Sequence, residues 1–211
     1  MDKLIENEVY RKLSAIYKDK SLWLDNIDYV AESLFRDSVR LQSKALWVLG
    51  EIGLVHPCEV SGYVTVISKY LKSPESVLRE RSLTALGRIG RADFTLIKPL
   101  FSELFVLAKD TESAVRLSFI WASENIATNT PDVFAQYMDV FAALLKDADD
   151  RVRMESPEIF RVIGKRIPEL VIPYLPLLEH ISESDTNSVV RVHASGAVKA
   201  TRKGITIYEK K

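Results

Sequence analysis

Features typical of secreted domains and membrane proteins are scarce in this sequence. The 211 residues include one cysteine, Cys58, so no internal disulfide can form. No amino-terminal run has the basic, apolar and small-residue order of a signal peptide. No apolar stretch approaches the roughly 18–20 residues needed to cross a bilayer. We therefore expect a cytoplasmic protein without a membrane segment.

The sequence also lacks an excess of charge of either sign, since 29 Lys and Arg residues face 29 Asp and Glu residues. A neutral chain has no global attraction for nucleic acid or for an anionic membrane, so any basic surface must be local. Apolar residues, in contrast, make up 47% of the chain, which is enough to bury a sizeable core at this length. The composition predicts a folded protein.

Motifs of common catalytic and metal sites are missing as well. His56, His180 and His193 have no partner at zinc-ligand spacing, and His193 falls at a core-facing position of its frame, where we expect a packed or capping histidine. Cys58 has only His56 as a neighbouring base, and such a pair at a helix start is usually incidental. No G-x-S-x-G, H-E-x-x-H or P-loop sequence occurs. We expect no catalytic residue, no metal ion and no cofactor.

What the sequence does contain is an internal repeat. The segment ALWVLGEIG at 45–53 returns as SLTALGRIG at 82–90, an offset of 37 residues. The same offset predicts a single domain made of an amino-terminal helix at 1–19, five frames and a short tail at 205–211. The frames span residues 20–56, 57–93, 94–130, 131–167 and 168–204.

Each frame has the pattern of a helix pair. Ala45, Val48, Leu49 and Ile52 follow the i, i+3, i+4, i+7 spacing of one helical face, and no useful length shows the alternation of a strand. We therefore predict an all-α fold, a right-handed α-α superhelix (α-solenoid) of about five helix pairs plus the amino-terminal helix.

Prolines and glycines mark the expected ends of the helices. Prolines in first helical turns and glycines in left-handed caps at helix C-termini are the favoured arrangement. The residues expected in these roles are Pro57, Pro131 and Pro168, and Gly53, Gly90 and Gly164. Pro157 falls inside a predicted second helix, which it should kink near residues 153–157.

An aspartate followed six residues later by an arginine recurs in the last three frames. The pairs are Asp110 with Arg116, Asp147 with Arg153 and Asp185 with Arg191. With the helix pairs, this pattern resembles the HEAT-repeat family over about residues 20–204. The resemblance implies a solenoid in which turn aspartates and second-helix arginines pair along the stack.

The first two frames depart from this pattern. Ser73 precedes Arg79 in the second frame, and Arg36 and Gln42 occupy the matching places in the first, which suggests an atypical capping repeat. The row of arginines that includes Arg79 and Arg116 could also bind phosphates. We favour a structural role, in which each arginine satisfies the turn before it.

Binding is expected on the side of the second helices that faces away from their core, because stacked second helices line the inner face of such a superhelix. Tryptophan and arginine are enriched at interface hot spots. Whether Trp47 and Trp121 are exposed or wedged between repeats stays open. The candidate partner-binding residues are Trp47, Arg88, Arg91, Trp121, Glu124, Glu158, Arg161, Lys165 and Arg202.

The expected function is a non-catalytic scaffold or adaptor that binds a protein or peptide partner of unknown identity. One alternative is a nucleic-acid binder similar to the DNA-repair glycosylases with helical repeats, to which Trp47, Trp121 and Glu158 superficially correspond. The neutral charge argues against it. Another alternative is a protein similar to the HEAT-like enzymes that attach bilins to light-harvesting proteins.

Overall fold

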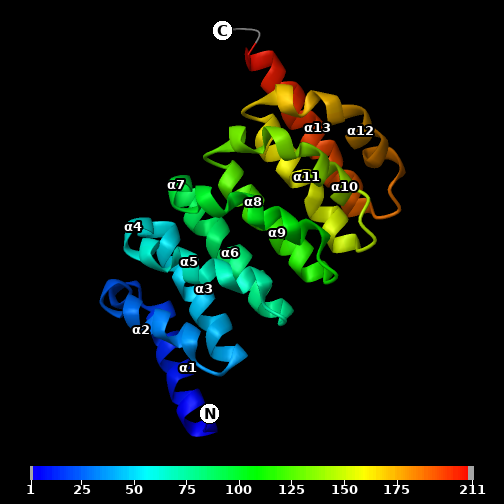
Figure 1. The fold of residues 1–211 in the computed structure, drawn as a ribbon. Coiled ribbons are helices and arrows are strands. Elements are labelled where there is room, and N and C mark those ends of the chain that lie inside the picture. The colour runs from blue at the N-terminus through cyan, green and yellow to red at the C-terminus, as the bar shows by residue number, and fades with distance from the viewer. Residues whose placement is uncertain (1, 209–211) are drawn as a thin grey trace. The chain divides into compact units, whose positions relative to one another are not determined.

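The computed structural model describes residues 2–208, and all regular elements in this range are helical (Figure 1). The all-α class that the periodicity predicts is confirmed. The chain divides into two compact units, residues 1–107 and 108–211, and each is described by itself. That residues 1–211 form a single domain stays a prediction.

Unit 1 begins with α1 (Lys3–Lys18), which packs against α3 (Val39–Val55). Helix α3 in turn packs along α6 (Ser76–Ala92). Both α3 and α6 are second helices of the predicted frames. The first segments of the frames contain α2 (Ile27–Glu32), α4 (Pro57–Val60), α5 (Val64–Lys69), α7 (Phe94–Ile97) and α8 (Phe101–Leu104).

Unit 2 contains the other three second helices, α9 (Ser113–Ala127), α11 (Asp150–Gly164) and α13 (Ser188–Tyr208). Helix α11 packs against both α9 and α13. Its first segments contain α10 (Met138–Leu144) and α12 (Leu175–Ser184). Helix α13 continues past residue 204 into the predicted tail, of which residues 209–211 lie outside the described part of the chain.

The first segments are not the single helices that the pattern predicts. Short 3-10 turns break each of them, and prolines stand at the start of several of the pieces. A proline has no N–H to donate and fixes φ, so it suits the first turn of a new helix and interrupts a longer one. These breaks occur at η1 (Lys20–Leu22), η2 (Leu24–Asn26), η3 (Ser33–Phe35), η4 (Ser61–Tyr63), η5 (Tyr70–Lys72), η6 (Lys98–Leu100), η7 (Phe105–Lys109), η8 (Pro131–Tyr137), η9 (Pro168–Leu170) and η10 (Ile172–Tyr174).

The second helices carry the core on the predicted face. Ala45, Val48, Leu49 and Ile52 of α3 are fully buried. In unit 2 the ring of Phe119 stacks on that of Phe141 at 5.4 Å between centroids. A continuous apolar stripe therefore fixes how each second helix faces its own repeat.

The assignment of the glycines to left-handed caps is wrong. Among the described residues no glycine has a positive φ, and Gly53 and Gly90 lie within α3 and α6. A Cβ on Gly53 would lie 2.5 Å from Cγ1 of Ile89 in α6, and a Cβ on Gly50, one turn earlier in α3, would lie 2.8 Å from the Cα of Ala85. The glycines therefore allow neighbouring helices to approach closely. Gly164 is likewise a packing position and ends α11 without a left-handed residue.

The predicted positions of the helix-starting prolines are confirmed, because Pro57, Pro131 and Pro168 each stand in the first turn of a short helix. Pro157 lies buried inside α11, which remains helical from Asp150 to Gly164. The kink at this proline stays a prediction.

Candidate functional site

The turns of unit 2 hold the aspartates and arginines in a connected network. The Arg116 guanidinium donates from Nε and Nη2 to both carboxylate oxygens of Asp147 in the next repeat, at 2.7 and 2.8 Å. Its Nη1 donates to the carbonyl of Asp110, in its own turn, at 2.7 Å. The hydrogen bond to Asp147 raises the pKa of Arg116. One arginine thus ties two successive turns together.

Arg153 repeats this arrangement one step along the chain. Its Nη1 donates to the carbonyl of Asp147 at 2.9 Å, and its Nε donates to the carboxylate of Asp185 at 3.1 Å. Arg191 donates to the carbonyl of Asp185 at 2.6 Å. In unit 1, Arg79 donates to the carbonyls of Ser73 and Pro74. All four arginines bond the carbonyls of the turn before their helix, as a structural role requires.

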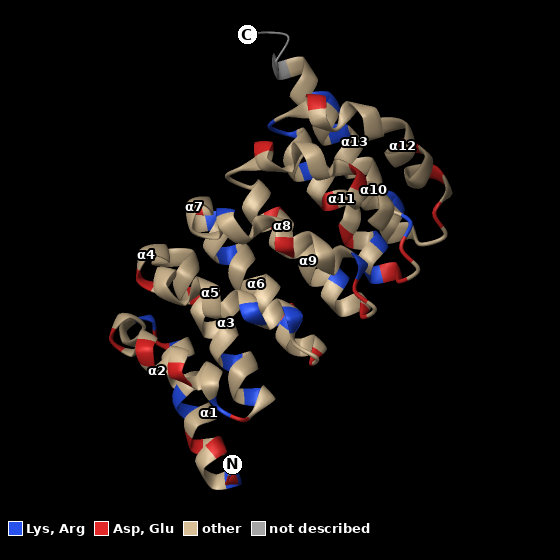
Figure 2. Ribbon diagram, viewed as in Figure 1, with Lys and Arg blue, Asp and Glu red and all other residues tan. Residues whose placement is uncertain are grey.

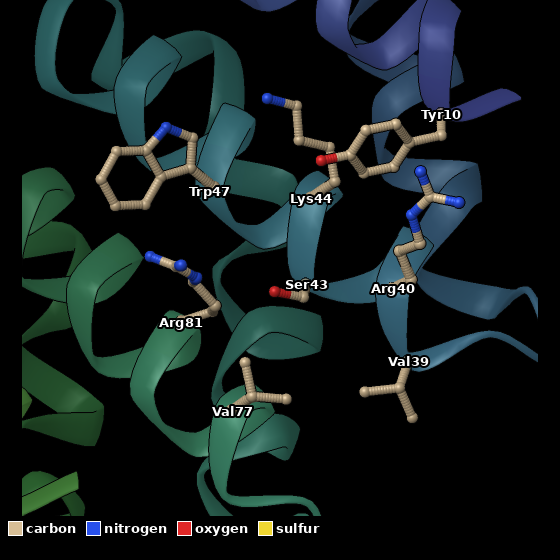
Figure 3. A pocket seen from close by; sticks show the side chains of 8 residues that line it. All are labelled: Tyr10, Val39, Arg40, Ser43, Lys44, Trp47, Val77 and Arg81. Carbon is tan, nitrogen blue, oxygen red and sulfur yellow. The ribbon is translucent and has the colours of Figure 1, made fainter. Parts of the chain in front are cut away.

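A cleft of about 540 Å³ opens on the second-helix face of unit 1, and we call it the α3–α6 cleft (Figure 3). It is lined by residues of α1, α3 and α6: Tyr10, Val39, Arg40, Ser43, Lys44, Trp47, Val77 and Arg81. Arg40, Lys44 and Trp47 share one face of α3 at i, i+4 and i+7, which is why they open onto the same space.

Cations lie against aromatic rings in and beside this cleft. The guanidinium of Arg81 lies 4.7 Å from the centroid of the Trp47 ring and that of Arg88 lies 4.1 Å from it. Arg40 lies 3.9 Å from the centroid of Tyr10, and the Lys44 ammonium 4.2 Å from that of Tyr17. The negative faces of the rings attract these cations. This attraction offsets part of the repulsion between the neighbouring positive charges.

The charge of the cleft is positive. Arg88 pairs with Glu51 at 2.9 Å, and Arg40 lies at 4.0 Å from Glu6. Burial lowers the pKa of Lys44, and the nearby charges of Arg81 and Lys18 lower it further. Burial also lowers the pKa of Arg88, against the attraction of Glu51. Figure 2 shows the Lys and Arg positions along α3 and α6.

A second cleft of about 540 Å³ opens in unit 2, and we call it the α11–α13 cleft. Gly196 widens it, because a Cβ there would meet nothing closer than the Arg161 Cδ at 3.9 Å. Its lining is largely acidic and comes from α9, α11 and α13: Glu124, Glu155, Glu158, Arg161, Val192, His193 and Gly196.

The carboxylates of the α11–α13 cleft differ in their partners. Glu158 pairs with Arg161, and its Oε1 lies 3.4 Å from Nδ1 of His193. The buried Oε1 of Glu124 has no hydrogen-bond partner among the described residues. Burial raises the pKa of Glu124 to about 8, and the charges of Glu155 and Glu158 add to the shift. Glu124 therefore carries a proton at neutral pH.

The structure brings together some of the candidate partner-binding residues. Trp47 and Arg88 are in contact in unit 1, and Glu124, Glu158 and Arg161 line one cleft in unit 2. Trp121 lies outside both clefts and is 43% exposed, whereas Trp47 is half-buried. The other three candidates are exposed: Arg91, Lys165 and Arg202. Arg202 pairs with Glu179 at 2.5 Å.

Several lining residues were missed by sequence reasoning. Tyr10 belongs to α1, outside the repeat frames, so the offset could not select it. Arg40 and Lys44 could have been found, because they precede Trp47 at helical spacing on the same face.

The expectation that His193 packs in the core is wrong. The last frame carries one extra residue before Arg191, so Ala194 takes the fully buried position and His193 turns toward Glu158. With an offset of 38 residues at this junction, His193 corresponds to Glu155, which lines the same cleft, and Ala194 corresponds to the buried Ser156.

No group of three or more potential metal ligands occurs among residues 2–208. Within the same range, no helix has the length and apolar character needed to cross a membrane. Cys58 is exposed.

No protein-family model and no curated protein matches the sequence. Solved structures do match. An engineered protein aligns with a TM-score of 0.73 and 21% identity over 97% of this chain and 93% of its own. A designed armadillo repeat protein in complex with the peptide (KR)4 aligns with a TM-score of 0.70 and 20% identity over 91% of each chain.

A homology model of the full-length AP-3 complex is also similar, with a TM-score of 0.81 and 16% identity. The match covers 96% of this chain and 35% of the AP-3 chain. These likenesses establish the fold: the chain has a helical repeat fold of the HEAT and armadillo type. The broken first segments agree with a repeat class whose units hold two or three helices.

Proposed function

We propose that this chain is a non-catalytic scaffold or adaptor that binds a protein partner through the α3–α6 cleft. The observation that carries the proposal is the open position of Trp47, a half-buried indole in contact with Arg81 and Arg88 beside a cleft of about 540 Å³. Aromatic and arginine side chains that are held in place before binding lose little conformational entropy when a partner docks, and they dominate interface energetics.

The fold supports the same proposal. Repeat folds present a continuous surface of second helices, and a designed armadillo neighbour is described as bound to a peptide. In unit 2, Arg161 and His193 engage Glu158, and Trp121 lies outside that cleft. This arrangement gives no support to a glycosylase-like pair of Trp121 and Glu158.

A random-peptide phage library panned on the immobilised full-length chain tests the proposal. We expect enriched peptides that bind the Trp47→Ala and Arg81→Ala variants at least about tenfold more weakly, since each variant removes one hot-spot side chain. Lys146→Ala, an exposed change in unit 2, is the control and should bind as the parent does.

Two results would contradict the proposal. Panning could enrich no peptide, or the enriched peptides could bind Trp47→Ala and Arg81→Ala as tightly as the parent. Circular dichroism and thermal melting of each variant separate a loss of binding from a loss of folding.

A further inference from the structure

The α3–α6 cleft holds positive charge that the protein itself does not neutralise. In the part of the chain that the structure describes, neither Lys44 nor Arg81 forms an ion pair. Both side chains are only partly exposed, and each lies over an aromatic ring. A positive charge near a low-dielectric wall, without a counter-charge, attracts an anion more strongly than a fully solvated lysine does.

The cations stand around a short apolar surface. Figure 3 shows Val39 and Val77 at one end of the cleft, Trp47 and Arg81 on one side and Arg40 on the other, with Ser43 between them. Val39 is 38% exposed although it is apolar. An aliphatic side chain of a ligand can cover both valines, while the Ser43 hydroxyl offers a hydrogen bond to a peptide group.

We infer that the α3–α6 cleft binds an acidic peptide segment, in which Asp or Glu carboxylates meet Lys44 and Arg81 and a neighbouring aliphatic side chain covers Val39 and Val77. The inference rests on the proposed function and names its class of partner. Each carboxylate would supply the counter-charge that Lys44 and Arg81 lack, and the guanidinium of Arg81 can donate two parallel hydrogen bonds to one carboxylate.

A peptide fits these observations better than a nucleic acid does. Sequence-tolerant binding of single strands requires open aromatic faces for the bases, whereas guanidinium groups already lie over the rings of Tyr10 and Trp47. A phosphate backbone also needs a long row of cations, and here Arg88 is engaged by Glu51 and Arg40 lies near Glu6. Two uncompensated cations beside an apolar surface suit a short acidic segment.

The test uses the full chain and fluorescence anisotropy at low salt. The probes are a fluorescein-labelled octapeptide of sequence EDLEDLED, its amide counterpart QNLQNLQN, the basic peptide (KR)4 and a single-stranded DNA of mixed sequence. We expect EDLEDLED to bind at least about tenfold more tightly than QNLQNLQN, because the two differ only in charge.

Charge reversal then locates the site. The double variant Lys44→Glu with Arg81→Glu should weaken EDLEDLED binding by at least about thirtyfold, since two attractions become repulsions. The matched control, Lys146→Glu with Lys199→Glu, makes the same change of net charge at exposed positions of unit 2 and should bind as the parent does. If the first variant fails to fold, Lys44→Gln with Arg81→Gln replaces it, with an expected loss of about tenfold.

Several outcomes would overturn the inference. QNLQNLQN or (KR)4 could bind as well as EDLEDLED, both double variants could weaken binding equally, or the DNA could bind more tightly and lose its affinity on reversal of Lys44 and Arg81. Peptides from the phage library that depend on Trp47 but are not acidic would retain the proposed function and refute the inference. Absence of binding by both EDLEDLED and any library peptide would refute both.

Discussion

The two units share one repeat pattern, but the clefts on their second helices differ in charge. Trp47 in unit 1 and Glu158 in unit 2 occupy equivalent places, three offsets of 37 residues apart. Around Trp47 the cleft carries Lys44 and Arg81, whereas around Glu158 it carries Glu124 and Glu155. The repeat therefore sets the position of a residue in space, while its chemistry is free to vary between repeats.

The turns of the two units differ as well. In unit 2 the guanidinium of Arg116 is bidentate to the Asp147 carboxylate of the next repeat. At the equivalent place in unit 1, the Gln42 amide donates to the carbonyl of Arg36 at 2.9 Å. A charged connection between repeats in one unit thus corresponds to a neutral bond within one turn in the other.

The largest expected effect follows from this difference between the turns. Arg116→Ala should lower the free energy of unfolding by about 2–4 kcal/mol, because it leaves the largely buried Asp147 carboxylate without its cation. Gln42→Ala, the equivalent change in unit 1, should cost about 0.5–1.5 kcal/mol, the value of one neutral hydrogen bond. Urea unfolding at neutral pH measures both; equal losses would show that the ladder adds nothing.

The buried acid of unit 2 should make stability depend on pH. Because the folded pKa of Glu124 is about 8 and its ordinary value is 4.5, the contribution of this group is fully present below pH 4.5 and is lost as the pH rises toward 8. Glu124→Gln imitates the protonated acid and should unfold with a free energy about 2–3 kcal/mol higher than the parent at pH 9 and little changed at pH 4.

Glu51→Gln, in unit 1, is the control for that pH series. It removes the ion pair with Arg88, so it should lower stability slightly at neutral pH and give no gain at pH 9. If Glu124→Gln gave the same difference from the parent at pH 4 and at pH 9, the buried acid would not be the cause.

Gly50 in unit 1 and Gly196 in unit 2 should respond in opposite ways to alanine. Gly50→Ala places a Cβ 2.8 Å from the Ala85 backbone, which forces α3 and α6 apart and should cost about 1–3 kcal/mol. Gly196→Ala in α13 meets only Arg161, at 3.9 Å, and should raise stability by about 0.5–1 kcal/mol through better helix propensity. Thermal melts of the two variants that shift in the same direction would remove this distinction.

The smallest expected effect separates the two tryptophans. Trp47→Ala should lower stability by about 1–2 kcal/mol, because the ring contacts Tyr17, Arg81 and Arg88. Trp121→Ala should change it by less than about 1 kcal/mol, since the indole is 43% exposed. Denaturant titrations of both variants check the order, and a larger loss for Trp121→Ala would contradict the burial described here.

The helical class and the places of the second helices could be predicted from the sequence because apolar periodicity reports one buried face, as at Ala45 and Ile52. The breaks in the first segments could not, since they depend on the local competition between α and 3-10 turns. The glycine caps were mispredicted because a Gly after an apolar run indicates equally a helix end or a close helix approach, and only the neighbour, Ile89 for Gly53, decides between them.

The candidate site was predictable only in part. The offset selected Trp47 and Glu158, each of which lines a cleft, but it cannot select residues outside the frames, such as Tyr10. It also failed at the one-residue insertion before Arg191, which moved His193 from the expected core to a cleft. Whether a cation has an acidic partner depends on which residues lie near it in space. The sequence therefore could not show that Lys44 lacks one.

The most direct test of the account is to map the bound acidic peptide on the whole chain by NMR. The ¹⁵N-labelled protein is titrated with EDLEDLED while backbone amide shifts are followed. We predict that the shifts change around Ser43 and Trp47 of α3 and around Val77 and Arg81 of α6, with little change near Glu158. Changes centred on α11 and α13, or none at saturating peptide, would contradict the assignment of binding to the α3–α6 cleft.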